Sequence, residues 1–358
     1  MSPKLFILMS TLSCLVAVGA LASCGGGGGG SGSVTAPPAQ PPPPLPPPPP
    51  PPPSPPPPST SIERDISPLA TDPTLTNHLA VHFAVTPNPQ TSADNRLFIM
   101  LPGTGAEPRF YREIVRTGAA AGYHAIGLGY PNAISVFDLC EGDLDPDCAG
   151  KVRREVITGQ GFSPLVSVSE SQSIVGRLTS LLTYLGATYP SEGWGQYLFS
   201  GAPNWNRITV AGHSQGSGHA AYLGRLQSLD RIVMFSGPSD IGLTGASPAL
   251  WFSQPSITPS SRYFGFTHAA DDLVPLALVD RNWAALGLSE AGPQTSVDGA
   301  APPYGRSQQL VTSAPPNPNP IGPTPSPTHA SPVVDAYTPI DAEGRPVYRA
   351  VWTYLAFQ

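Results

Sequence analysis

Charged side chains are scarce in this chain of 358 residues, where they make up 12%, about half the usual share in soluble domains. Lysine is especially rare, since only Lys4 and Lys151 occur, and residues 1–60 contain no acid at all. Residues 61–358 hold all 24 acids and 17 of the 18 bases, which gives them a formal charge of −7. Proteins that bind nucleic acid present a basic face, so this composition argues against a nucleic acid as the partner.

Heptads, internal repeats and long apolar runs are also missing after the N-terminus. Their absence excludes a coiled coil, a repeat array and a multi-span membrane protein. Residues 61–358 are numerous enough to build a full hydrophobic core. We therefore expect one globular domain over 61–358.

Residues 1–23 have a positively charged start and a mostly apolar stretch that ends in small residues, which is typical of a secretory signal peptide. The end of this segment and the cysteine after it resemble the lipobox of bacterial lipoproteins, with the sequence Leu21-Ala22-Ser23-Cys24. The resemblance implies that Cys24 becomes a lipidated N-terminus and anchors the protein in the cell envelope. In that family Gly25 after the cysteine favours the outer membrane. Ordinary cleavage after Ser23, leaving a free cysteine, is the alternative.

Residues 24–60 read as a tether between this anchor and the domain. A run of glycines, Gly25–Gly30, is followed by a tract in which 18 of the 22 residues from Pro37 to Pro58 are proline. Glycine runs are flexible, whereas a proline tract adopts an extended polyproline II helix of roughly 70 Å. We therefore expect a disordered linker that holds the domain away from the membrane.

Two cysteines remain after the anchor, in Cys140-Glu-Gly-Asp-Leu-Asp-Pro-Asp-Cys148. In an exported protein such a close pair is expected to form a disulfide, which would stabilise the fold by about 2.5 kcal/mol in the chain-entropy model. The alternation of Glu141, Asp143, Asp145 and Asp147 leaves a calcium site as a rival, although the EF-hand spacing is incomplete.

Short apolar runs alternate with helical periodicity through the rest of the domain. Unbroken apolar strands that alternate with helices predict a mostly parallel central sheet with helices on both faces. No long apolar lid occurs, and residues 240–263 are expected to form a small cap or a loop beside the site, so the cap is small or absent. The expected strands are 79–85, 96–101, 124–128, 207–211, 231–235, 263–267 and 309–312, and the expected helices are 108–121, 169–189, 215–226, 275–286 and 346–356.

The sharpest motif is Gly212-His213-Ser214-Gln215-Gly216, in which His213 is the variable residue. It follows an expected strand and opens an expected helix, which is the context of a nucleophile elbow. Such a turn exposes the serine hydroxyl, and glycines are needed because side chains would collide in it. The helix N-terminus beneath Ser214 favours the negative charge that develops during acyl transfer.

From this motif onward the chain resembles the α/β-hydrolase superfamily, over roughly residues 79–358. In that family the serine is followed in the chain by an acid and then a histidine. The segment from His268 to Pro275 is similar to the family's acid loop, and counting back from Pro275 favours Asp271 over its neighbour Asp272. Asp240 is a further alternative for the acid.

The resemblance also implies a histidine in a late loop, and His329 is the only one after residue 268. His329 would take the proton of Ser214, while the aspartate would hold the imidazole in the right tautomer. An oxyanion hole needs preorganised N–H groups. The resemblance implies the N–H of Gln215 and one from Gly103-Thr104-Gly105, where we favour Thr104 over Gly105.

These features predict an envelope-anchored serine hydrolase that acts on carboxylic esters, without a cofactor or metal ion. The triad also serves amidases, thioesterases and peptidases, so the leaving group stays open. Alternatives are a polyester depolymerase of cutinase type and an inactive binding protein that kept the fold. Three features are similar to one bacterial branch of the superfamily: the elbow with the following Gly218-His219-Ala220-Ala221, the preceding Trp205-Asn206-Arg207, and the acid loop. This resemblance implies no particular substrate.

Overall fold

The structure is a computed structural model that describes residues 61–88, 95–245, 247–322 and 326–358. The predicted signal peptide, the lipidation site Cys24 and the proline-rich linker lie outside the described residues. Within the described part of the chain, no helix has the length and apolar character that a bilayer crossing requires.

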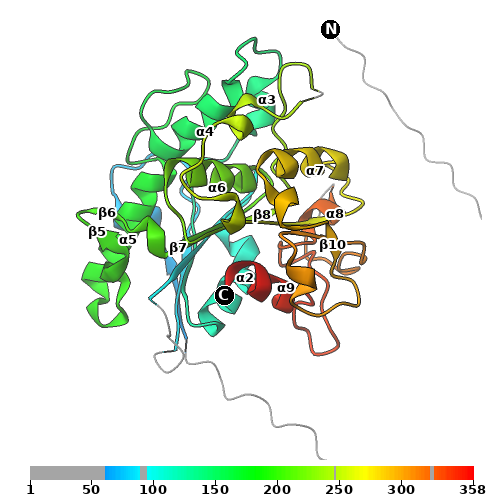
Figure 1. Ribbon diagram of the computed structural model, residues 1–358. Helices are drawn as coiled ribbons and strands as arrows, with labels where there is room; N and C mark the ends of the chain where they lie inside the picture. Colours follow the sequence, from blue (N-terminus) through cyan, green and yellow to red (C-terminus); the bar gives the residue numbers. More distant parts are fainter. Residues whose placement is uncertain (1–60, 89–94, 246, 323–325) are drawn as a thin grey trace, which may run out of the picture. The chain divides into compact units, whose positions relative to one another are not determined.

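The domain is built on one mixed sheet of nine strands (Figure 1). The pairs β1–β2 and β2–β4 are antiparallel, whereas every other neighbouring pair is parallel. The mostly parallel sheet that we predicted is therefore seen in part. In spatial order the strands are β1 (Ile62–Ile66), β2 (His82–Thr86), β4 (His124–Gly127), β3 (Leu97–Leu101), β7 (Ile208–His213), β8 (Arg231–Phe235), β9 (Tyr263–His268), β11 (Gln309–Thr312) and β10 (Thr295–Ser296). A separate hairpin pairs β5 (Leu198–Phe199) with β6 (Ala202–Pro203).

Helices cover both faces of this sheet, as expected (Figure 1). One face carries α2 (Arg112–Ala120) and α9 (Arg349–Ala356), which contact each other. The other face carries α1 (Pro68–Thr71), α4 (Cys148–Thr158), α5 (Ile174–Thr188), α6 (Gln215–Leu226) and α7 (Leu276–Ala285). Two further helices, α3 (Val136–Cys140) and α8 (Pro327–Ala330), are short and lie in loops.

The unbroken apolar strands explain why two hydrophobic cores form. Successive strand side chains point to opposite faces of a sheet. In β3, Leu97, Ile99 and Leu101 accordingly join the core under α5 and α6, whereas Phe98 and Met100 join the core under α2 and α9. Burial on both faces is the reason that these strands do not alternate between apolar and polar residues.

Several elements differ from the sequence prediction. The predicted helix 108–121 begins as a 3-10 helix, η1 (Pro108–Tyr111), before α2. The elements that were not predicted are α1, α3, α4, α8, β1, β5, β6 and β10. Between β8 and β9 the described residues form only two 3-10 helices, so no cap domain is found there. These two are η5 (Leu250–Ser253) and η6 (Ser260–Arg262). The other 3-10 helices besides η1 are η2 (Pro190–Glu192), η3 (Trp194–Tyr197), η4 (Trp205–Arg207), η7 (Leu288–Ala291) and η8 (Tyr304–Arg306).

Candidate active site

Three predicted site residues follow three parallel strands of the sheet. Ser214 comes directly after β7, Asp271 comes three residues after β9, and His329 lies in α8, in the segment after β11. The carboxyl ends of parallel strands face one edge of a sheet, where α/β proteins commonly bind their ligands. Residues far apart in the chain are brought together at this edge.

Ser214 occupies a strained turn between β7 and α6. Its φ of 54° and ψ of −119° lie in a region that non-glycine residues rarely adopt. Two glycines leave room for the turn: a Cβ on Gly212 would lie 2.0 Å from the carbonyl oxygen of Gly216, and one on Gly216 would lie 2.3 Å from that of Leu101. The turn therefore has the backbone of a nucleophile elbow.

Asp271 and His329 are in direct contact. Nδ1 of His329 lies 2.8 Å from Oδ2 and 3.1 Å from Oδ1 of Asp271. Oδ1 also accepts the backbone N–H groups of Leu273 and Val274, at 2.9 and 2.8 Å. Burial raises the pKa of Asp271, but the hydrogen bonds from His329 and the two N–H groups outweigh it and leave the pKa lowered. Asp271 is therefore ionised at neutral pH.

The other ring nitrogen of His329 is left open. Nε2 is buried and has no hydrogen-bond partner among the described residues, although the histidine is only 4% exposed. His329 and Ser214 line the same cavity of about 620 Å³. Buried polar groups are normally paired, so a ring nitrogen left unpaired in a cavity that Ser214 also lines is unusual.

The two alternative acids have other partners. Asp272 is exposed, and its Oδ1 accepts the backbone N–H of His329 at 3.3 Å rather than contacting the ring. Asp240 is buried in a two-point ion pair with Arg153 and also accepts the indole N–H of Trp251 at 2.7 Å. Of the three aspartates, only Asp271 hydrogen-bonds the imidazole.

The loop after β3 supplies a candidate oxyanion donor. The N–H of Gly103 donates to the Tyr111 hydroxyl at 3.1 Å, and the N–H of Gly105 donates to the carbonyl of Asn132 at 2.9 Å. Within the described ranges, the N–H groups of Thr104 and Gln215 have no acceptor. The Thr104 hydroxyl donates to Oε1 of Gln215 at 2.8 Å, which ties the two residues together.

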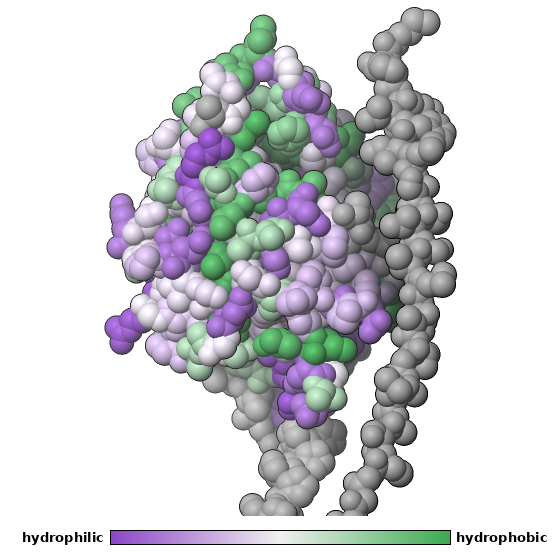
Figure 2. Space-filling view, turned by 90° about the vertical axis from the view of Figure 1, so that its right-hand side faces the viewer, coloured by the Kyte–Doolittle hydropathy of each residue, from purple (hydrophilic) through white to green (hydrophobic). Residues whose placement is uncertain are grey.

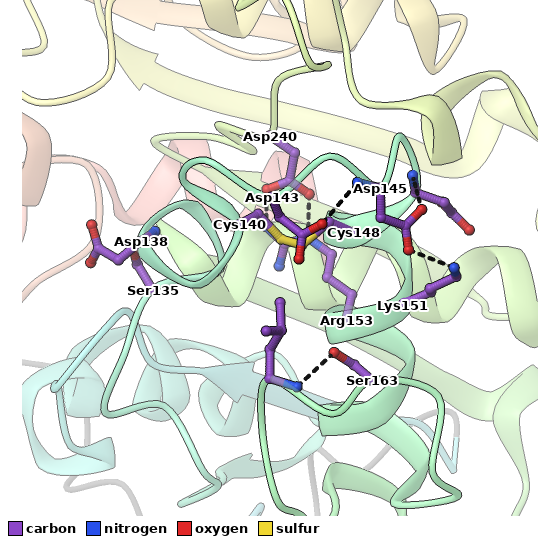
Figure 3. Close-up of a disulfide and its surroundings, with 12 residues drawn as sticks. Ser135, Asp138, Cys140, Asp143, Asp145, Cys148, Lys151, Arg153, Ser163 and Asp240 are labelled. Carbon is purple, nitrogen blue, oxygen red and sulfur yellow. Dashed lines mark hydrogen bonds and ion pairs between the residues drawn. A yellow bond between two sulfur atoms is a disulfide. The ribbon is translucent and has the colours of Figure 1, made fainter.

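Arg153, which the sequence analysis did not single out, supports the Gln215 side of this arrangement. Its Nη1 donates to the carbonyl of Gln215 at 3.0 Å while its other nitrogens bind Asp240. Figure 3 shows Arg153 on α4 together with Asp240 and the nearby disulfide. An arginine directly after the cysteine loop is a weak signal by itself, because arginines are usually exposed.

His213 was expected to be a variable position, yet it joins two parts of the site. Its Nδ1 lies 3.0 Å from the Tyr111 hydroxyl, and its Nε2 lies 3.1 Å from the carbonyl oxygen of His329. Burial, and then the neighbouring His329, lower the pKa of His213 to about 3, so the ring is neutral. Its Nε2–H can then donate to His329, and Nδ1 can accept from Tyr111, whose hydroxyl accepts the N–H of Gly103.

The predicted disulfide between Cys140 and Cys148 is confirmed, with an Sγ–Sγ distance of 1.99 Å. Two acids of its loop, proposed as calcium ligands in the alternative, have other contacts. Asp143 and Asp145 accept backbone N–H groups two residues further on, and Asp145 also pairs with Lys151. No cluster of three or more metal-binding side chains occurs in the part of the chain that the structure describes.

No protein-family model and no curated protein matches the chain. Among solved structures, one similar chain is a thermophilic esterase, Est2, of the planctomycete Thermogutta terrifontis, with 15% identity and a TM-score of 0.33 over 65% of this chain and 75% of that chain. Another is Thermogutta terrifontis esterase 2 phosphoramylated by tabun, with 12% identity and a TM-score of 0.37 over 70% of this chain and 82% of that one. At these identities and TM-scores, neither match says what this chain does.

Proposed function

We propose that this protein is a serine hydrolase of the α/β-hydrolase fold that cleaves carboxylic esters through a covalent acyl-enzyme on Ser214. His329 is the general base and Asp271 is the acid that orients it. The N–H groups of Gln215 and Thr104 form the oxyanion hole. The order of the three residues in the chain and the strand-to-helix turn at Ser214 support membership of that superfamily.

One observation carries the proposal. A buried carboxylate holds Nδ1 of His329, while Nε2 is unpartnered in the cavity that Ser214 also lines. The carboxylate holds the proton on Nδ1, so Nε2 presents a lone pair. A structural histidine would be expected to have both nitrogens satisfied, because an unpaired buried polar group is costly.

The reaction follows from these positions. His329 Nε2 takes the proton of the Ser214 hydroxyl as Oγ bonds to the ester carbonyl carbon, and the negative carbonyl oxygen is held by the two N–H groups. The intermediate collapses, and His329 gives the proton to the departing alcohol oxygen. Water then attacks the acyl-serine, its proton passes to His329, and the carboxylic acid leaves as Ser214 regains a proton.

We further propose that the protein is exported and anchored at the cell envelope by lipid on Cys24, with residues 25–60 as the spacer. Labelling of cells with a radioactive fatty acid tests this proposal. Lipid label on the native chain, and release of a Cys24→Ala variant into the periplasmic fraction, are the expected results. Equal release of both forms would refute the anchor.

The site is tested with a fluorophosphonate, which reacts with activated serines, and with the p-nitrophenyl ester of butyrate. We expect mass spectrometry of the full exported chain to find the label on Ser214. Ser214→Ala should abolish both label and turnover. Ser296→Ala, which removes an exposed serine on the edge strand β10, serves as the control and should keep both. Ester turnover by Ser214→Ala at the native rate would rule out this mechanism.

A further inference from the structure

Two cavities meet at Ser214, and their linings differ in a way that separates the two halves of an ester. One has about 620 Å³ and is lined by His329. The other has about 750 Å³ and is lined by Gln215, and its described lining does not include His329. In the proposed mechanism His329 returns its proton to the alcohol, so the alcohol must lie on the His329 side. The acyl group then lies in the larger cavity.

The larger cavity adjoins another cavity beside the disulfide loop. A neighbouring cavity of about 400 Å³ shares several lining residues with it, among them Val136, Phe137 and Ile241, and is also lined by the loop 140–148. The two cavities together, from Ser214 to Leu144, are called the acyl groove below. Asp240 lines both parts, where its charge is balanced by Arg153, and the larger part is also lined by the opposite charges of Asp138 and Arg281. The acids Glu141, Asp143 and Asp145 line the smaller part, at the end near Leu144.

Large apolar side chains surround the mouth of the acyl groove. Leu144 is 87% exposed, Leu243 60%, Leu273 59% and Phe137 47%, and they come from four different segments. Figure 2 shows hydrophobic side chains in green gathered over the upper part of the face that it presents. Scattered exposed leucines are ordinary, but several around one cavity indicate a surface that binds an apolar ligand.

Several contacts restrain the loop that carries the exposed Leu144. The disulfide closes the loop, Asp143 and Asp145 accept the N–H groups of residues 145 and 147, and Lys151 binds Asp145. A loop restrained in this way has little freedom to fold its leucine back onto the protein. Preorganisation of this kind reduces the entropy lost when a ligand binds.

The charges near the rim point to an uncharged ligand. Glu141, Asp143 and Asp145 flank Leu144, and only Asp145 is paired with a lysine. They would repel an anionic lipid surface. We propose that the acyl groove binds a long, unbranched, uncharged acyl chain of the ester substrate, with the carbonyl at Ser214 and the far end of the chain at Leu144. This inference rests on the proposed function, because the assignment of acyl and alcohol sides uses the role of His329.

The first test measures kcat/KM of the full exported chain for p-nitrophenyl butyrate, dodecanoate and hexadecanoate. We expect kcat/KM to rise with acyl length in the native chain. Leu144→Ser and Leu243→Ser should lower it about tenfold for hexadecanoate, from the lost apolar contact, and leave butyrate unchanged. Leu69→Ser, at a leucine 43% exposed on α1 and away from the groove, is the matched control and should change neither.

A second substrate separates the two sides of the site. Hexadecyl acetate has its long chain on the alcohol, so we expect Leu144→Ser to leave its turnover unchanged. Equal losses with hexadecanoate and with hexadecyl acetate would overturn the assignment of the groove to the acyl side. An identical dependence on acyl length in native and Leu144→Ser chains would overturn the role of the rim.

A binding measurement tests whether the acyl groove holds a long apolar chain, even if the protein hydrolyses no ester. The probe is an uncharged fluorescent hexadecyl ether, which cannot be hydrolysed, and its butyl homologue is the comparison. Ser214→Ala should bind the hexadecyl ether, and adding Leu144→Ser should weaken binding about tenfold. No preference for the longer ether would refute the groove, whereas no butyrate turnover by the native chain would refute only the hydrolase. Binding to uncharged lipid vesicles that requires Leu144, without binding of the ether, would make the rim a membrane contact and refute the single-chain proposal.

Discussion

Two buried aspartates follow neighbouring parallel strands at the same edge of the sheet, and they have different partners. Asp271, after β9, binds the imidazole of His329, whereas Asp240, after β8, binds the guanidinium of Arg153. A guanidinium stays protonated at every accessible pH, so it can only position and balance charge. An imidazole can gain and lose a proton near neutral pH, so it can take part in the reaction. In the mechanism proposed above, the partner of each aspartate, rather than its burial, separates a positioning role from a catalytic one.

Removing the charge of Asp271 tests the catalytic half of this comparison. We expect Asp271→Asn to lower kcat for p-nitrophenyl butyrate by about 10⁴, because an amide no longer holds the reactive tautomer of His329. The folded structure, followed by circular dichroism, should persist. Asp272→Asn is the matched control, since Asp272 accepts only a backbone N–H from that residue, and it should keep kcat within about tenfold. Similar small losses in both variants would move the role of the acid elsewhere.

Breaking the other pair tests the positioning half. Asp240→Asn leaves Arg153 buried without a counter-charge, and we expect the free energy of unfolding in urea to fall by about 3–5 kcal/mol. The double variant Arg153→Met with Asp240→Leu should recover most of that loss, since it buries no charge. Its kcat should fall less than that of Asp271→Asn. If the double variant were as unstable as the single one, charge balance would not be the function of the pair.

The disulfide next to this pair contributes a smaller share of the stability. Replacing Cys140 and Cys148 together by serine should lower the free energy of unfolding by about 2.5 kcal/mol, because the unfolded loop gains conformational freedom. Reducing agent should destabilise the native chain by a similar amount and leave the double variant unaffected. A larger effect of reducing agent on the double variant would contradict this account.

His213 joins Tyr111 to the backbone of His329, and its removal should act mainly on the reaction rate. In His213→Phe the carbonyl of His329 keeps the Ser236 hydroxyl but loses one donor. We expect kcat to fall about three- to tenfold, the effect of a single neutral hydrogen bond, with KM unchanged. A variant that changed KM alone would show that His213 acts on substrate binding rather than on the position of His329.

The lowered pKa of Asp271 gives a pH dependence that Asp271→Asn should lack. A carboxyl whose pKa is lower in the folded than in the unfolded state stabilises the fold above the ordinary aspartate pKa of about 3.9. That stabilisation is lost as the pH falls through the folded-state pKa. We expect the difference in unfolding free energy between native and Asp271→Asn chains to shrink as the pH falls below about 4. A difference that grew in acid would contradict the sign of the shift.

Much of the fold was accessible from the sequence because its elements have strong local patterns. The apolar runs of β3, β7 and β9 and the periodicity of α6 were placed close to their observed bounds, whereas α5 begins five residues later than predicted. The helices on either side of the disulfide loop were missed, since α3 is short and α4 begins inside a loop defined by its acids. The strand β1 and its pairing with β2 were also missed, because this edge strand, Ile-Glu-Arg-Asp-Ile, is mostly exposed and carries three charged residues in a row.

The elbow at Ser214, the disulfide and the order of the candidate acid and histidine were determined by the sequence alone, because each depends on spacing within one segment or on how few candidates follow. The tertiary structure decided which aspartate touches His329, why the N–H of Gly105 is occupied, and that Arg153 and His213 brace the site. The longest of these contacts joins residues that are 116 positions apart in the chain, and no local pattern encodes them. They arise because parallel strands bring their carboxyl ends, and every loop that follows them, to one edge of the sheet.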